Sequence, residues 1–147
     1  MSEFPDAASA HAFNSNIAEE FRANDGKVGG PFEGANMMLL HTTGAKSGQP
    51  RLAPLVYHPV DGKIFIAGSK GGAPTSPDWV HNLRAHPRVP IEIGTSSGIE
   101  AYDALARELP EDERAVTYAA IAAAVPAFAD YQSKTTRPIP VFELVRA

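Results

Sequence analysis

The chain has 147 residues, of which 44% are hydrophobic and 20% charged, and its net charge is −4. Length and composition are those of one globular domain with a core, and the acidic balance excludes a broadly basic surface for nucleic acid. Because the chain contains no cysteine, disulfides, thiol catalysis and cysteine-ligated metals are excluded.

The first elements predicted are a helix, a connector and three strands. A helix is predicted over residues 7–24, where apolar residues recur at every fourth position before Gly26. Residues 26–34 form a connector rich in glycine and proline. Strands are predicted over 37–43, 51–59 and 63–69.

Two turn signals shape these strands. Pro54 lacks an amide hydrogen, which indicates an edge strand or a bulge. Asp61-Gly62 predicts a tight hairpin turn.

Residues 70–87 are predicted to form a loop followed by a helix. Ser76 could cap that helix with Pro77 as its first residue, or Thr75 and Asp78 could form a capping pair.

The second half begins with a hairpin and ends with a strand. Strands are predicted over 88–94 and 98–108, with Glu92, Glu100 and Asp103 facing solvent. Residues 110–124 begin with proline and three acids, which suit a helix N-terminus. Pro126 ends this helix, a short helix is predicted over 127–133, and the last strand over 139–145.

Short connections between strands predict a mainly antiparallel sheet. About six short strands with helices outside them fit a small barrel of the α+β class. The same pattern argues against a parallel nucleotide-binding sheet. The domain prediction is one unit over 1–147, with an N-terminal helix within residues 1–26 and a barrel core over residues 36–147.

Positive charge is concentrated in the middle of the chain. Residues 44–88 hold six basic and two acidic residues, a local charge of +4, whereas the remainder holds seven basic and fifteen acidic residues. This distribution favours a local anion site over a broad polyanion surface.

Two glycine-rich basic loops are candidates for that site. The first, "TTGAKSGQPRLAPL" (42–55), lacks the spacing of a P-loop. Its backbone amides could still bind an anion, together with Lys46, Ser47 and Arg51. Spacing alone favours a solvated turn. The second loop, "SKGGAP" (69–74), follows a strand and precedes a helix, so the two loops together weakly favour one shared anionic ligand.

Three side chains have competing interpretations. Trp79 could cover a flat ring system, although a lone tryptophan is more often a core or interface anchor. His81 fits a helix surface better than a general base. Tyr131 could donate a proton or hydrogen bond to a substrate, but a tyrosine at the core boundary with its hydroxyl in water is commoner. The five histidines form no metal-binding pair on a helix, and we expect no metal site.

Several motifs together resemble the deazaflavin-dependent nitroreductase and quinone reductase family of actinobacteria. They are "EEFRANDGKVGGPFEG", "LLHTTGAKSGQPRLAPLVY", "IAGSKGGAPTSPDWVHNL", "HPRV" and "YQSKTTRPIPVFEL". The resemblance covers about residues 13–147, and the order and spacing of the motifs make it specific. It implies a split β-barrel related to flavin-mononucleotide-binding oxidases. It also implies the anionic cofactor coenzyme F-420 (8-hydroxy-5-deazaflavin), from which a hydride passes to quinones, nitroaromatics or activated enones.

The resemblance also implies roles for particular residues. Positions matching the grip on the cofactor's phosphate and tail are Lys46, Ser47, Gly48 and Arg51. Positions along the ring are Pro54 and Leu55, and those of the second cofactor loop are Ala67, Ser69, Lys70 and Gly71. Trp79, Asn82 and Leu83 match the helix that closes the site. Tyr131 matches a tyrosine near cofactor and substrate, whereas Val125 and Phe128 stand where some relatives have further tyrosines.

Two rival functions stay open beside this reading. One is a flavin-mononucleotide-dependent reductase of the same fold, and the other is a non-catalytic carrier of deazaflavin or of a lipophilic ligand. The partner expected is a small-molecule substrate, with no nucleic acid. A homodimer and peripheral membrane contact through the N-terminal helix are open. The acidic start of the chain resembles no signal peptide, so a cytoplasmic location, free or at the inner face of the membrane, is expected.

Overall fold

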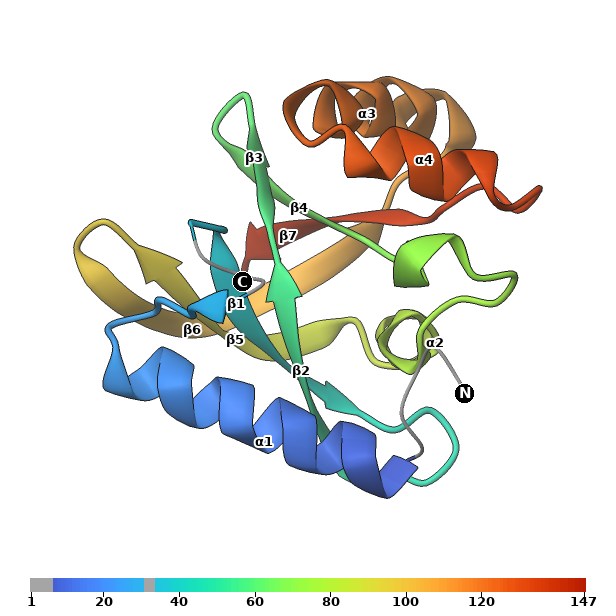
Figure 1. The fold of residues 1–147 in the computed structure, drawn as a ribbon. Coiled ribbons are helices and arrows are strands. Elements are labelled where there is room, and N and C mark those ends of the chain that lie inside the picture. Colours follow the sequence, from blue (N-terminus) through green and yellow to red (C-terminus); the bar gives the residue numbers. More distant parts are fainter. Residues whose placement is uncertain (1–6, 31–33) are drawn as a thin grey trace.

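The structure is a computed structural model that describes residues 7–30 and 34–147. These residues form one sheet of seven strands with helices against it (Figure 1). The first half comprises α1 (Ala7–Ala23), β1 (Met37–Thr43), β2 (Pro50–Val56), β3 (His58–Val60), β4 (Lys63–Ala67) and the 3-10 turn η2 (Lys70–Gly72). The second half comprises α2 (Asp78–Ala85), β5 (Arg88–Thr95), β6 (Gly98–Glu108), α3 (Glu111–Ala124), α4 (Ala127–Ser133) and β7 (Val141–Arg146).

The sheet is antiparallel throughout, with the strand order β2-β1-β5-β6-β7-β4-β3. Strands β2 and β3 follow one another in the chain but lie at opposite edges of the sheet. The sheet therefore curls into an incomplete barrel (Figure 1). Tyr57 connects the two edge strands along the chain. Two hydrogen bonds hold it: its amide donates to the carbonyl of Asn36 at 2.8 Å and its hydroxyl to that of Gly94, in β5, at 2.7 Å. The predicted α+β class and antiparallel pairing are confirmed.

The hairpin predictions hold, and some strand limits change. Asp61 and Gly62 both have positive φ, 52° and 77°, as a two-residue hairpin turn requires. The strand expected over 51–59 is two strands broken at Tyr57, and Pro54 lies on edge strand β2. The last strand begins only at Val141, because the prolines before it lack amide hydrogens.

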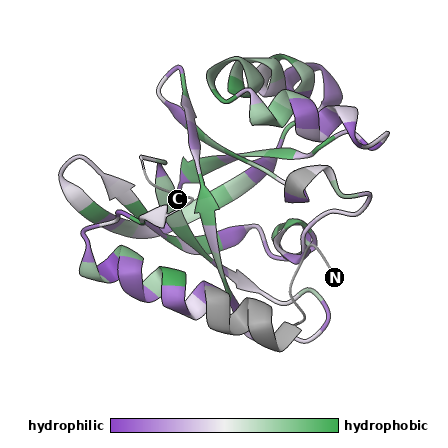
Figure 2. Ribbon diagram, in the orientation of Figure 1, coloured by the Kyte–Doolittle hydropathy of each residue, from purple (hydrophilic) through white to green (hydrophobic). Residues whose placement is uncertain are grey.

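The core lies on both faces of the sheet. Inside the curl, alternate residues of the strands, such as Ile91 and Phe142, pack with Val80 and Leu83 of α2. Outside, α1 covers β1 through Phe21, while α3 and α4 cover β4 and β7. Figure 2 shows the central strands as mostly hydrophobic and α1 as mixed. Helix α2 therefore packs inside the curl of the sheet through Val80 and Leu83.

Two local predictions are wrong. Neither Ser76 nor the Thr75–Asp78 pair caps α2, because the N-cap residue is Pro77 and no side chain bonds to the first turn. Glu92 does not face solvent freely: only 20% of its side chain is exposed. The Arg22 guanidinium donates to both of its carboxylate oxygens, and His41 bonds to one of them. Glu92 therefore ties α1 to the sheet.

Candidate functional site

The basic turn between β1 and β2 is fixed by its own hydrogen bonds. The amide of Gly44 donates to the Gln49 carbonyl at 2.8 Å, and the amide of Gly48 donates to the Gly44 carbonyl at 3.0 Å. The Gln49 amide donates to Ser47 Oγ at 3.2 Å. Among the residues that the structure describes, no acceptor binds the amides of Lys46 and Ser47. These two amides are thus the donors of the turn that can bind an anion.

Asn82 anchors this turn to α2. Its side-chain oxygen accepts the amide of Ala45 at 2.9 Å, and its side-chain nitrogen donates to Thr42 Oγ1 at 3.1 Å. Asn82 and Thr42 are both buried, so these bonds are shielded from water. The resemblance places Asn82 at the cofactor, and the geometry gives it a supporting position behind the basic turn.

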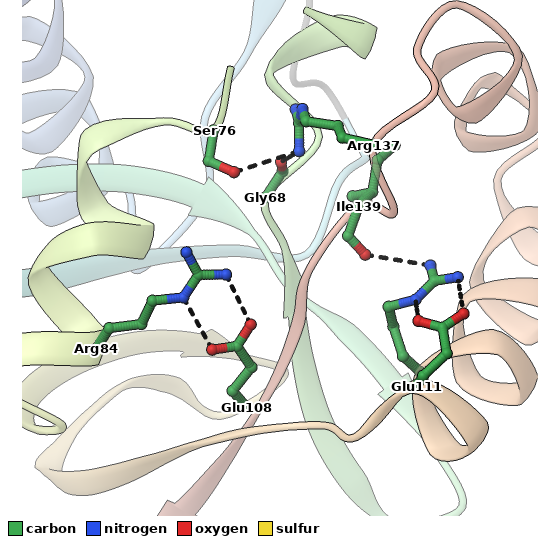
Figure 3. A network of polar contacts seen from close by, with 8 residues as sticks. Gly68, Ser76, Arg84, Glu108, Glu111, Arg137 and Ile139 are labelled. Atoms are coloured by element: carbon green, nitrogen blue, oxygen red, sulfur yellow. Dashed lines mark hydrogen bonds and ion pairs between the residues drawn. The ribbon is translucent and has the colours of Figure 1, made fainter. Parts of the chain in front are cut away.

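The positive charge near this turn is less than the sequence predicts. Arg84 forms a bidentate ion pair with Glu108, in which Nε and Nη2 lie 2.9 and 2.8 Å from the two carboxylate oxygens (Figure 3). Arg88 Nη2 lies 3.5 Å from Asp103 Oδ2. Both acids come from β6, outside the segment counted as basic. Lys46 and Arg51 are exposed and form no ion pair with any described residue. Two of the uncompensated charges therefore lie at the turn and at the start of β2.

The second loop runs from Gly68 to Ser76 and contains a strained residue. Lys70 has a φ of 47°, which is uncommon for a residue other than glycine. The turn closes with hydrogen bonds from the Gly72 amide to the Ser69 carbonyl (2.9 Å) and from the Ala73 amide to the Lys70 carbonyl (3.1 Å). Such strain persists only where surrounding contacts impose it.

Arg137 supplies those contacts, and the sequence reasoning assigned it no role. Its guanidinium donates to the carbonyls of Ala73 (2.9 Å), Ser69 (2.9 Å) and Gly68 (3.2 Å) and to Ser76 Oγ (3.3 Å). Figure 3 shows its guanidinium beside Gly68 and Ser76. Burial lowers the pKa of Arg137, and no described carboxylate pairs with it to oppose this effect. Its only signal in sequence is an arginine inside the "YQSKTTRPIPVFEL" motif.

Tyr131 lies beside this loop. A Cβ built on Gly72 would come within 2.7 Å of the Tyr131 carbonyl oxygen, so α4 packs directly on η2. The ring of Tyr131 is half-buried and meets Phe128 edge-on at 5.2 Å. Its hydroxyl bonds to no described residue, whereas neighbouring Tyr118 donates to the Phe128 carbonyl. Burial raises the pKa of Tyr118 to about 12. Of these two phenols, only Tyr131 is free to meet a ligand.

The other residues expected at the site lie in the core or on strands β2 and β4. Trp79 and Leu83 are 8% and 1% exposed and point into the core, where Trp79 meets Phe142 at 6.0 Å. The core interpretation of Trp79 is therefore the one that holds. Pro54 pairs with Leu39, which faces α1, whereas Leu55 packs in the barrel interior. Only one of these two side chains can contact a ring on a given face. Ala67 is half-buried at the end of β4.

Hollows elsewhere on the molecule do not coincide with these loops. One of about 400 Å³ lies between β4 and α3, where Arg107 lines it beside its ion-pair partner Glu113. Another of about 370 Å³ lies against β5 and β6.

Among the described residues no group of three or more histidine or acidic side chains is placed to hold a metal. His81 is exposed on α2. None of the helices in the described ranges is long and apolar enough to cross a membrane.

An incomplete antiparallel barrel with two glycine-rich basic loops beside one inner helix defines a small-molecule-binding protein of the split β-barrel type. Residues 15–145 match the family described as F420H(2)-dependent quinone reductase, and the chain belongs to this family. Its members are oxidoreductases that use coenzyme F-420, as the resemblance implied.

Individual relatives agree with this assignment. A quinone reductase of this family from Mycobacterium tuberculosis (strain H37Rv) is 38% identical over 136 residues, which cover 86% of this chain and 85% of the relative. A solved F420-H2 dependent reductase, FDR-A, is 40% identical with a TM-score of 0.63, covering 74% of this chain and 92% of its own. A solved domain-swapped dimer is 33% identical with a TM-score of 0.63, covering 93% and 98% of the two chains.

Proposed function

We propose that this protein binds reduced coenzyme F-420 across its two basic loops and uses it to reduce quinones. The observation that supports this most is the turn at 44–49. It presents the Lys46 side chain and two amides, with Arg51 following at the start of β2; among the described residues neither cation has an ion-pair partner and neither amide has an acceptor. Such a group of donors fits the anionic phosphate and tail of the cofactor.

Each segment of the proposed site has a separate task. Lys46, Ser47, Gly48 and Arg51 bind the anionic end, and Ala67, Ser69, Lys70 and Gly71 hold the cofactor from the second loop. Leu55 or Pro54 lies against the ring, and Asn82 keeps the basic turn in place. Trp79 and Leu83 act through the packing of α2. When bound, the reduced cofactor supplies a hydride, and most of the rate enhancement comes from holding the reactants in line.

The acceptor needs a proton as well as a hydride. A hydride alone converts a quinone to the hydroquinone monoanion, and one further proton completes the hydroquinone. Tyr131 supplies that proton or orients the acceptor carbonyl, because its hydroxyl is a hydrogen-bond donor that bonds to no described residue. Nitroaromatics and activated enones are further acceptors in this proposal. Phe128 and Val125 limit their range, because they replace aromatic hydroxyls near the site.

The proposed unit is a single domain over residues 1–147, in which an N-terminal helix within residues 1–26 precedes the barrel core over residues 36–147. A homodimer is proposed as its assembly, supported by the 33% identical structure that is a domain-swapped dimer. Residence in the cytoplasm, with peripheral contact of the N-terminal helix with the membrane, is proposed because membrane quinones are lipophilic acceptors.

A fluorescence titration tests the cofactor assignment. Coenzyme F-420 should bind much more tightly than flavin mononucleotide, and turnover of menadione should follow when the reduced cofactor is supplied. Equal or tighter binding of flavin mononucleotide would contradict the cofactor assignment. Tight binding of coenzyme F-420 without turnover of any quinone would leave a carrier in place of an enzyme.

A further inference from the structure

Arg137 is unusual among the arginines of this chain in the acceptors that it binds. Arg22, Arg84, Arg107 and Arg114 each bond to carboxylates. Arg137 bonds only to neutral acceptors, three carbonyls and one hydroxyl, all within nine residues of one loop. A cation placed against neutral acceptors is not neutralised by them, whereas these four guanidinium groups are neutralised by their carboxylate partners.

The four bonds act on the strained segment of the loop. The Ser69 carbonyl accepts both the Gly72 amide, which closes η2, and Arg137 Nη2. The carbonyls of Gly68 and Ala73 lie on either side of η2. They accept hydrogen bonds from Nη1 and Nε of Arg137, respectively. The guanidinium therefore fixes both ends of the turn that holds Lys70 at a φ of 47°.

Arg137 is itself held in place by the segment before and after it. The Gln132 side chain donates to the Arg137 carbonyl at 2.8 Å and accepts the Ile139 amide at 3.1 Å. The Gly68 amide donates to the Pro140 carbonyl at 2.8 Å. The planar fork of the guanidinium is thus presented to the loop from a braced backbone, which reduces the entropy lost in forming its bonds.

We propose that Arg137 is a positioning residue for the cofactor: it pre-forms the loop 68–76 in its binding conformation and adds an uncompensated positive charge behind it. This inference rests on the proposed function, because the loop binds the cofactor only there. Without the four bonds, the loop would populate unstrained conformations. The apparent affinity for the cofactor would then fall in proportion to the fraction of molecules whose loop keeps the binding conformation.

Arg137→Lys is the informative variant, since it keeps the charge but cannot form the four-bond fork. Arg114→Gln is the matched control. Arg114 Nη1 also donates to a carbonyl of the same terminal segment, that of Ile139 at 3.3 Å, but Arg114 makes no bond to loop 68–76. The first readout is the dissociation constant for coenzyme F-420 by fluorescence titration. The second is hydrogen exchange of the Gly72 and Ala73 amides in the cofactor-free protein.

Arg137→Lys should weaken binding about 10-fold or more, the scale of hydrogen bonds to a charged group, and should speed exchange of both amides. Arg114→Gln should bind as the parent does, with the loop amides still protected. Ser76→Ala, which removes one acceptor only, should shift both readouts in the same direction by less; it serves if Arg137→Lys does not fold.

Three outcomes would overturn the inference. Arg137→Lys could bind as the parent does with its loop amides protected, or Arg114→Gln could lose as much affinity as Arg137→Lys. Affinity could also fall with no change in exchange, which would mean that the loop is not pre-formed by Arg137. Failure of the parent itself to bind coenzyme F-420 would overturn the proposed function, a distinguishable result.

Discussion

The Cα of Gly72 faces the backbone of Tyr131 so closely that no side chain fits between them. A Cβ at Gly72 would lie 2.7 Å from the Tyr131 carbonyl oxygen and 3.0 Å from Lys134 Cβ. Gly72 also has a φ of 85°, which only glycine adopts at little cost. This contact joins the second basic loop to the helix of the proposed proton donor, two segments that are far apart in the sequence.

Gly72→Ala should therefore destabilise the protein through both strain and overlap. We expect a loss of about 2 kcal/mol or more in the free energy of unfolding, measured by chemical denaturation. Gly62→Ala is the control, because Gly62 has a similar φ of 77° but no atom within 4 Å of its added Cβ. It should lose only about 1 kcal/mol. Equal losses would show that α4 yields freely to the added methyl group.

Lys46→Ala and Arg51→Ala should each weaken cofactor binding by about 1–3 kcal/mol, the scale of a charge-assisted hydrogen bond. The loss should shrink as salt is added, because exposed charges are screened. Titration of deazaflavin fluorescence at two ionic strengths measures it. Lys63→Ala is the control and should bind the cofactor normally. Lys63 is exposed on the β3–β4 hairpin and has no ion-pair partner among the described residues. If both turn variants bind as the parent does, the turn is only solvated.

Tyr131→Phe should lower turnover more than it lowers cofactor affinity. A proton-donating role contributes about 100- to 10,000-fold, and an orienting bond less. An interaction made only in the transition state lowers kcat and kcat/KM together. Steady-state quinone reduction, read beside a cofactor titration, measures the two effects. Tyr57→Phe is the control: it removes the bond to the Gly94 carbonyl and should cost stability but not turnover. Unchanged turnover in Tyr131→Phe would make solvent the proton source.

Glu92 should make stability depend on pH in the acidic range. Its hydrogen bonds from Arg22, and secondarily from His41, lower the pKa of its carboxyl to about 2, against the opposing effect of burial. A folded pKa below the unfolded value of 4.5 stabilises the protein above pH 4.5, and the contribution is lost as pH falls toward 2. Arg22 is half exposed, so we expect only about 1–2 kcal/mol.

The measurement compares unfolding of the parent and of Glu92→Gln between pH 7 and pH 2. The other acidic residues are the same in both proteins, so the difference between the two isolates Glu92. That difference should shrink as pH falls from about 4.5. A difference independent of pH would mean that the ion pair with Arg22 contributes nothing measurable.

Local patterns predicted most of the fold. The strand predicted over 88–94, the Asp61-Gly62 turn and the Pro126 break each depend on a few neighbouring residues, and each matches an element of the structure. What local patterns could not predict is pairing across the chain. The neutralisation of Arg84 by Glu108, and the partial burial of Glu92 between Arg22 and His41, depend on the strand order.

The same limit applies to the site. The basic turn and the glycine-rich loop were visible because they combine glycines with basic residues in a chain of net negative charge. Their supports were not: Asn82 bonds to Ala45 and Thr42 from another element, and Arg137 reaches a loop more than 60 residues away. Trp79 could be read as a ring-covering residue because its burial depends on Phe142 and the barrel interior.

The position of β7 has a consequence for how the chain folds as it is made. This strand comes last in the chain order, yet it pairs with β6 on one side and β4 on the other, in the interior of the sheet. Until Val141–Arg146 have left the ribosome, β4 and β6 have no common neighbour and the barrel stays open between them. Folding during synthesis must then wait for the final strand, and the nascent chain exposes two strand edges that chaperones or another copy could engage.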